Sequence, residues 1–151
     1  MSIAEGTVDL MKEFAQPIEA VFAAWSNEEA QLVWGDPGEG WEMAFDQFRF
    51  AVGETDICRF GPVGGQQYVN ENRYLAIEPW KRIVYSTSVH SKGSLSFAGT
   101  VVVTFHDANT GTQLKLVEHG IYFDPQDDVM DHRSGWESML DALGKYLRHQ
   151  R

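Results

Sequence analysis

One glutamate stands out among the residues that could do chemistry, because its strand is expected to point it inward. Leu114 and Leu116 are the apolar residues of the last predicted strand, so Glu118 shares their face while His119 lies on the other. An inward carboxylate could act as an acid, a base or an anchor for a polar ligand group. The structural alternative is a glutamate near the open end of the sheet, solvated or bonded to an arginine such as Arg73.

His132 is the second candidate for chemistry. It follows Val129 by three residues and precedes Trp136 by four, the spacing that places side chains on one face of a helix. From there it could meet Glu118 as a polar pair across the space between sheet and helix. The structural alternative is a half-exposed histidine satisfied by water or by a neighbouring carboxylate.

Large apolar side chains supply the remaining candidate lining. Rings on the inner face of a sheet are more often core than ligand contacts. Trp34 and Trp41 bracket a glycine-rich loop, which is either a gate at the mouth of a pocket or an ordinary surface loop. The predicted ligand-binding residues are Trp34, Trp41, Phe48, Tyr85, Phe105, Glu118, His132, Trp136 and Met139.

Several other chemistries are not indicated. No two of the five histidines stand three or four residues apart, so no metal site on a helix is expected, and we predict neither a metal nor a cofactor. Glu118 and His119 are adjacent in a strand, so their side chains face opposite ways and are not expected to bind one metal ion together. Cys58 has only Arg59 as a basic neighbour, on the other face of the strand, so a catalytic thiolate is not expected.

The composition limits the compartment and the partners. The net charge of −10 and the absence of any lysine or arginine cluster argue against nucleic acid and anionic membranes. No apolar run approaches the length of a membrane span, and residues 1–10 lack the pattern of a signal peptide. A single cysteine fits a reducing cytoplasm. A chain of 151 residues is expected to form one domain over 1–151.

The elements that must position these residues follow from periodicity and turn chemistry. A strand over Thr7–Phe14 precedes a short helix that opens at Pro17, and Ser26 with Glu29 predicts a capping box for a second short helix through Trp34. Six further strands then follow. They are predicted at Met43–Ala51, Thr55–Phe60, Tyr68–Ile77, Arg82–Val89, Phe97–His106 and Gln113–Gly120.

The last stretch, Asp124–Arg151, predicts the longest helix. Its apolar residues recur at helical spacing, Asp124 with Pro125 predicts the N-cap and first turn, and basic residues gather at the other end. Gly135 in mid-helix costs about 1 kcal/mol relative to alanine, so a close approach of the sheet or of a ligand is expected there, and close packing of the helix on the sheet is the favoured cause. Seven antiparallel strands tend to curl around an apolar element. We therefore predict an α+β fold, the helix-grip arrangement, with a ligand cavity between sheet and helix.

Ordered motifs along the chain resemble the START-like (SRPBCC) superfamily, in its branch related to the activator of heat-shock-protein-90 ATPase. The motifs are Glu13–Trp25, Val33-Trp34-Gly35, Glu78-Pro79 before Arg82-Ile83-Val84, Gly111-Thr112, Glu118-His119-Gly120 and Gly135-Trp136. The resemblance implies a helix-grip fold with an internal cavity for apolar molecules. Where this branch commonly has an Asp, an Arg and a Gly-Gly pair, the chain has Phe48–Glu54, so a role for that arginine or for the second glycine does not carry over.

Three functions compete on this basis. The first is a binding module for a small apolar or amphipathic ligand. The second is a cofactor-independent enzyme of the polyketide cyclase or dehydratase type, in which the polar pair would transfer protons in a dry cavity. The third is a chaperone-regulating or stress-response interaction domain. A homodimer is possible, but the sequence gives no argument for or against it, because exposed apolar patches cannot be counted from a sequence.

Overall fold

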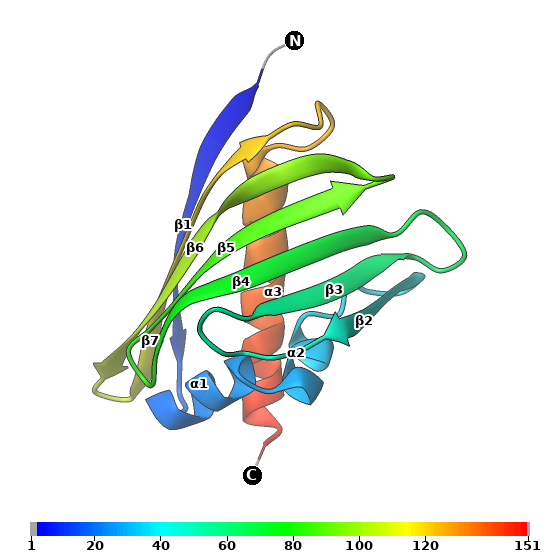
Figure 1. Cartoon of the computed structure of the whole chain (residues 1–151). Coiled ribbons are helices and arrows are strands. Elements are labelled where there is room, and N and C mark those ends of the chain that lie inside the picture. Colours follow the sequence, from blue (N-terminus) through cyan, green and yellow to red (C-terminus); the bar gives the residue numbers. More distant parts are fainter. Residues whose placement is uncertain (1–2, 151) are drawn as a thin grey trace.

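The computed structural model describes residues 3–150, and in this range the chain forms seven strands and three helices (Figure 1). The strands form one antiparallel sheet in the order β1-β7-β6-β5-β4-β3-β2, which curves around the last helix. This confirms the predicted helix-grip fold. The elements are β1 (Ala4–Phe14), α1 (Ile18–Trp25), α2 (Glu28–Trp34), β2 (Trp41–Gln47), β3 (Thr55–Pro62), β4 (Tyr68–Glu78), β5 (Arg82–Ser91), β6 (Ser94–Ala108), β7 (Gly111–Tyr122) and α3 (Val129–Arg148).

The helix caps differ from the predicted ones. The Asp128 side chain accepts a hydrogen bond from the Asp131 amide at 2.9 Å and caps α3, whereas Asp124 closes a turn by accepting from the Gln126 amide at 2.9 Å. The predicted N-cap at Asp124 is therefore wrong by four residues. At α2 the cap is Asn27, not Ser26. Arg151, predicted to close the last helix, lies outside the described residues.

The second strand is shorter than predicted. It ends at Gln47 instead of Ala51, because the chain turns away from the sheet over 48–50 and Phe50 adopts a φ of 42°. The backbone amides of Arg49 and Phe50 donate to the buried carboxylate of Asp56, at 2.5 and 3.1 Å, instead of continuing the ladder. A carboxylate thus sets the end of this strand.

The core lies between α3, α1 and the part of the sheet centred on β1, β7 and β6. Leu114, Leu116 and Leu143 are fully buried there. α3 approaches β1 and α2 most closely, while β3, β4 and β5 extend past it (Figure 1). The expected close approach of sheet and helix at Gly135 is wrong, because a methyl group at that position would meet no atom within 4 Å.

No helix in the range 3–150 is long and apolar enough to cross a bilayer.

Candidate functional site

The inner face of the sheet carries Glu118 in the row predicted by strand parity. Glu118 lies opposite Val8 of β1 and Val101 of β6, and Val101 lies opposite Tyr85 of β5. Glu118 is 5% exposed. Its carboxylate is therefore almost entirely removed from water and must find its partners within the protein.

Those partners come from α3. His132 Nδ1 lies 2.7 Å from Glu118 Oε1, and Trp136 Nε1 donates to Glu118 Oε2 at 3.0 Å. The other imidazole nitrogen, His132 Nε2, lies 2.8 Å from Asp127 Oδ2. The structure thus brings together Glu118 and His132, as the functional interpretation of the sequence predicted. Arg73, the alternative partner, is exposed and does not contact Glu118.

The environment of His132 fixes its charge. Burial alone would lower the pKa of His132, but the hydrogen bonds and negative charges of Asp127 and Glu118 outweigh burial and raise the pKa to about 9. The ring also packs against Phe97 and Tyr122, with centroids 4.4 and 4.9 Å away. At neutral pH the site therefore holds an imidazolium between two carboxylates, enclosed by two rings.

This arrangement favours anchoring over proton transfer. Each oxygen of Glu118 already accepts a hydrogen bond, and a charged His132 cannot accept a proton. The geometry therefore holds the first turns of α3 and the Trp136 indole against β7.

The predicted aromatic residues fall into two groups. Trp34, Tyr85 and Phe105 are buried at 4% exposure each, and Trp34 donates its indole N–H to the Ala24 carbonyl at 2.9 Å. Burial raises the pKa of the Tyr85 hydroxyl, with further contributions from the Glu118 and Asp56 carboxylates. These three residues belong to the hydrophobic core.

The second group keeps contact with solvent. Phe48, Trp136 and Met139 are half-buried, and the Trp136 indole stacks on Trp25 of α1 at 6.2 Å. Trp41 is 40% exposed and lies at the far corner of the sheet. Only this second group and His132 present surface to a ligand in the structure as it stands.

A polar strip on the inner face was missed by the sequence reasoning. The Asn70 Nδ2 donates to Thr87 Oγ1 at 3.0 Å, and Asn70 and Asn72 exchange hydrogen bonds at 3.2 Å. Both asparagines share the face of the buried Tyr74, and both remain half-exposed. The same alternation that pointed Glu118 inward would have identified them.

Asp127 was also missed as a partner of His132. The helix predicted over Asp124–Arg151 contained it. Because α3 begins at Val129, Asp127 instead lies in the preceding loop and folds back onto His132.

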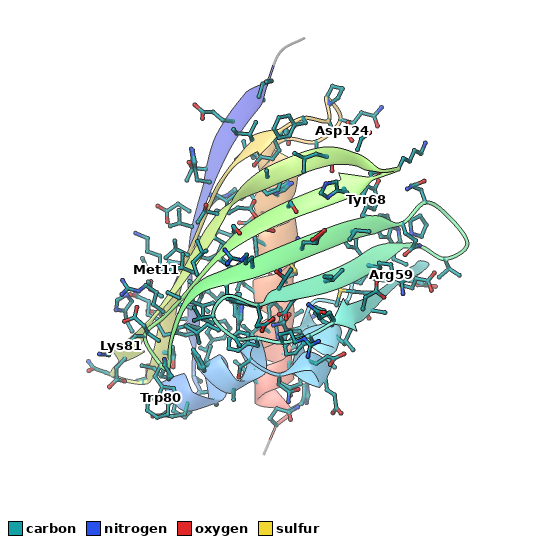
Figure 2. All side chains as sticks on the ribbon, viewed as in Figure 1. Met11, Arg59, Tyr68, Trp80, Lys81 and Asp124 are labelled. Carbon is teal, nitrogen blue, oxygen red and sulfur yellow. The ribbon has the colours of Figure 1, made fainter. Side chains whose placement is uncertain are left out.

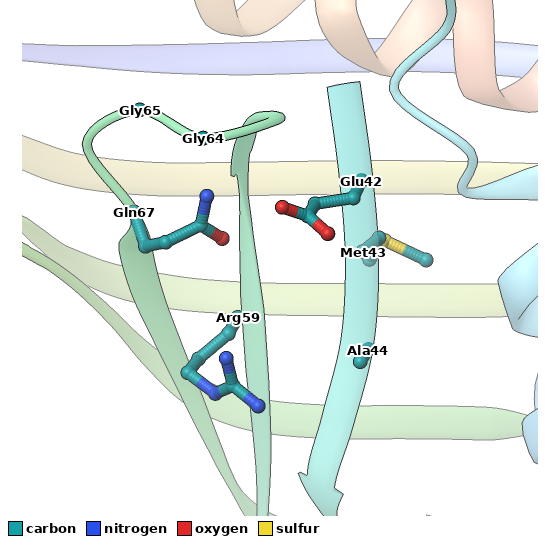
Figure 3. Close-up of a pocket in the computed structure, with 7 residues that line it drawn as sticks. All are labelled: Glu42, Met43, Ala44, Arg59, Gly64, Gly65 and Gln67. Atoms are coloured by element: carbon teal, nitrogen blue, oxygen red, sulfur yellow. The ribbon is translucent and has the colours of Figure 1, made fainter. Parts of the chain in front are cut away.

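Two surface hollows lie away from the inner face. One, of about 300 Å³, is lined by Glu42, Met43, Ala44, Arg59, Gly64, Gly65 and Gln67 (Figure 3). Figure 3 shows the Glu42 and Gln67 side chains directed toward one another and Met43 pointing away. The other, of about 310 Å³, lies between the end of β1 and the last turns of α3. The predicted enclosed cavity stays a prediction.

The arrangement of possible metal ligands and the state of the one cysteine can both be described for residues 3–150. Within 3–150 no group of three or more histidine, cysteine or carboxylate side chains is arranged to hold a metal ion. Burial raises the pKa of the Cys58 thiol to about 12, which keeps it protonated at neutral pH.

The family assignment follows from comparison with known proteins. The model of the family described as activator of Hsp90 ATPase homolog 1-like protein matches residues 15–148. The chain belongs to this family. The match confirms the resemblance drawn from the sequence motifs. A search of the curated proteins gave no match.

Solved structures similar to this member of the activator of Hsp90 ATPase homolog 1-like family share the whole fold. A Rhizobium leguminosarum protein has 25% identity and a TM-score of 0.88, with 99% of this chain and 98% of that chain covered. A Rhizobium loti protein has 27% identity and a TM-score of 0.85, covering 97% and 99%. An AHSA1-like protein from Aeromonas hydrophila, at 18% identity and a TM-score of 0.70, covers 97% and 98% and shows the fold alone.

Proposed function

We propose that the chain binds a small apolar or amphipathic molecule on the inner face of the sheet, beside α3. The ligand would lie against Trp136, Met139 and Phe48, with the polar strip of Asn70 and Asn72 opposite. Ligand sites combine such apolar walls with a few polar groups that fix orientation.

The observation that carries the proposal is the incomplete cover of the inner face. Inward-pointing side chains of β3 and β4, among them Phe60, Tyr68 and Asn72, keep partial contact with solvent although they share the face of buried Tyr74. On the helix side, the position of Gly135 opens onto free space. Gly135 lies three residues from His132 and four from Met139, so it belongs to the same helix stripe. A ligand in this space would bury apolar surface that is otherwise exposed to solvent.

Glu118 and His132 would act in this site as structural anchors. Their hydrogen bonds fix the position of the Trp136 indole, which is then a rigid wall for the ligand. Rigid walls lower the entropy lost on binding and so favour affinity.

A cofactor-independent enzyme is the second candidate, and the Asp127–His132–Glu118 array is the observation that favours it. A charged histidine could donate a proton to a bound substrate. Against this, both ring nitrogens already face carboxylates, at 2.7 and 2.8 Å. A substrate would have to displace one of them, so we rank binding first.

A chaperone-regulating role is the third candidate, suggested by the family name, activator of Hsp90 ATPase homolog 1-like protein. A direct assay is the effect of the purified chain on the ATPase rate of heat-shock protein 90. A stimulated rate would support that role for this chain.

The proposed ligand site is tested by filling it. Gly135 and Ser134 are both exposed, but only Gly135 lies on the helix stripe of His132 and Met139. Gly135→Leu would therefore place a side chain beside the proposed ligand, whereas Ser134→Leu adds the same group one residue away, outside that stripe. Leucine is a better helix former than glycine, so the first change does not weaken α3 by propensity. The probe is N-phenyl-1-naphthylamine, a neutral fluorescent molecule, which we expect to bind the wild type and Ser134→Leu equally well. Its affinity for Gly135→Leu should be at least about tenfold lower, a loss of ~1.4 kcal/mol in binding free energy.

Native mass spectrometry of the protein from its own host is the companion measurement. A mass adduct that is lost on denaturation would identify the natural ligand, and Gly135→Leu should reduce it. Equal probe binding by the wild type and Gly135→Leu would contradict the site.

A further inference from the structure

Three aromatic rings form a stack at the open corner of the inner face. The Trp41 and Tyr68 rings are parallel within 3°, with centroids 6.3 Å apart, and Tyr68 stacks on Phe60 at 5.3 Å. The rings come from three neighbouring strands, β2, β4 and β3. Phe60 lies directly opposite both Met43 and Tyr68. Trp41 stands two residues from Met43, so all three rings share one face.

This face is the inner one. Phe60 has the strand parity of buried Cys58, and Tyr68 that of buried Tyr74. The Met43 methyl group would lie 3.2 Å from a Cβ added at Gly35, beside the end of α2, which covers the same face. The stack therefore continues the surface on which Asn70 and Asn72 lie. Its last ring, Trp41, is 40% exposed.

Most charged residues close to this corner in the chain are acidic. Asp36, Glu39, Glu42 and Asp46 stand within five residues of Trp41, and that stretch contains no lysine or arginine. Lys92 is the basic residue on the other side, in the turn after Ser91, which pairs with Tyr68. On the adjoining strand, Arg59 is already paired with Asp46 at 2.7 Å. With a net charge of −10 for the whole chain, the potential at the corner favours cations and disfavours anions.

We infer that the Trp41–Tyr68–Phe60 stack binds the cationic head of the ligand, an organic amine or quaternary ammonium compound with an apolar tail. The inference rests on the proposed function, because the tail would occupy the inner face beside α3. An aromatic face attracts a cation through its quadrupole, most strongly in tryptophan. The surrounding carboxylates add to this attraction without contacting the ligand, and they repel a carboxylate head.

The test compares three ligands with the same tail and different heads. Octyltrimethylammonium, 1-octanol and octanoate carry a cationic, a neutral and an anionic head, and each is titrated into the full chain by calorimetry below its micelle concentration. We expect the cation to bind about tenfold more tightly than the alcohol, within the range expected for cation–π contacts. Octanoate should bind most weakly. Raising the salt concentration should reduce the advantage of the cation, because the carboxylates are near the surface.

Two tryptophan variants locate the head group. Trp41→Leu keeps an apolar side chain but removes the strongest cation-binding ring, so it should remove most of the advantage of the cation and leave 1-octanol binding within about twofold. Trp80 is the matched control, since it is 54% exposed and lies at the opposite end of β4 from Tyr68 (Figure 2). Trp80→Leu should leave the affinities for octyltrimethylammonium and for 1-octanol unchanged. The Trp41 indole N–H signal in NMR spectra should shift with the cation.

The outcomes separate this inference from the proposed function. Equal binding of cation and alcohol, or an advantage of the cation that is undiminished in Trp41→Leu, would overturn the inference while the tail site stands. Failure of all three ligands to bind would contradict the proposed site itself. Loss of 1-octanol binding in Gly135→Leu, together with loss of the cation's advantage in Trp41→Leu, would support both.

Discussion

The charge state of His132 is set by the two carboxylates that face its ring nitrogens. Replacing Glu118 by Gln neutralises one of them while keeping the side chain's size. We expect the pKa of His132, about 9 in the wild type, to fall in Glu118→Gln because burial, which lowers the pKa, is then opposed by Asp127 alone. NMR titration of the His132 ring measures this directly. A pKa unchanged in the variant would show that Glu118 does not act on the ring.

The same pair links stability to pH with a definite sign. The pKa of His132 is raised on folding, from 6.5 to about 9, so the native state binds the proton more tightly than the unfolded chain. This contribution is complete below pH 6.5 and is lost as pH rises through about 9. Its size is on the order of 3 kcal/mol. Urea unfolding at several pH values should show this loss in the wild type and a smaller one in Glu118→Gln.

At the scale of elements, one buried carboxylate holds Arg49 and Phe50 to the sheet, while Gly53 and Glu54 bond the backbone of Tyr74. Asp56, which is 2% exposed, accepts from the Arg49 and Phe50 amides and from the Tyr74 hydroxyl, the last at 2.6 Å. Asp56→Asn would turn an NH₂ group toward at least one of these donors. We expect a loss of about 2–3 kcal/mol in the free energy of unfolding.

Hydrogen exchange distinguishes a local effect from a global one. The amides of Arg49 and Phe50 should exchange faster in Asp56→Asn than the amides of α3. The matched control is Asp46→Asn, which breaks an exposed ion pair with Arg59 and should cost much less stability than Asp56→Asn. Equal costs in the two variants would argue against the role of Asp56.

The elements show what periodicity can and cannot predict. Strand parity placed Glu118 inward and helical spacing placed His132 on the face of Trp136, because both depend on neighbours two to four residues away. The end of β2 was missed because it depends on the side chain of Asp56, on the next strand. Asp127 was missed for a related reason: the true cap, Asp128, shifts the start of α3 and returns Asp127 to the loop.

The lining of the site was harder to predict than its polar pair. Parity alone cannot separate rings that are sealed, such as Phe105, from rings that remain accessible, such as Trp136, because burial depends on what other elements cover. The strand alternation that placed Glu118 on the inner face also predicts that Asn70 and Asn72 point inward. The bond from Asn70 to Thr87 could not be predicted because it depends on the register of β4 against β5.

At the scale of the whole molecule, a row of glycines lets the sheet wrap closely at one end. Gly6, Gly120 and Gly99 lie opposite one another on β1, β7 and β6. A Cβ at Gly6 would lie 2.7 Å from Val129 of α3, and a Cβ at Gly120 would lie 2.4 Å from the Phe97 ring. The row therefore admits both the start of α3 and the ring that covers His132.

Gly120→Ala tests whether this close approach is needed for stability. The added methyl group would overlap Phe97 and lie 2.8 Å from the Ala98 carbonyl, so we expect a loss of about 1–3 kcal/mol in the free energy of unfolding. Phe97→Leu should recover part of that loss in the double variant, because the shorter side chain frees the space above Gly120. Gly135→Ala makes the same change where a methyl group meets nothing and should stabilise α3 by up to about 1 kcal/mol. Urea unfolding of the four variants and the wild type would decide the matter: a strictly additive double variant would show that Phe97 and Gly120 do not interact, and the packing account would then be wrong.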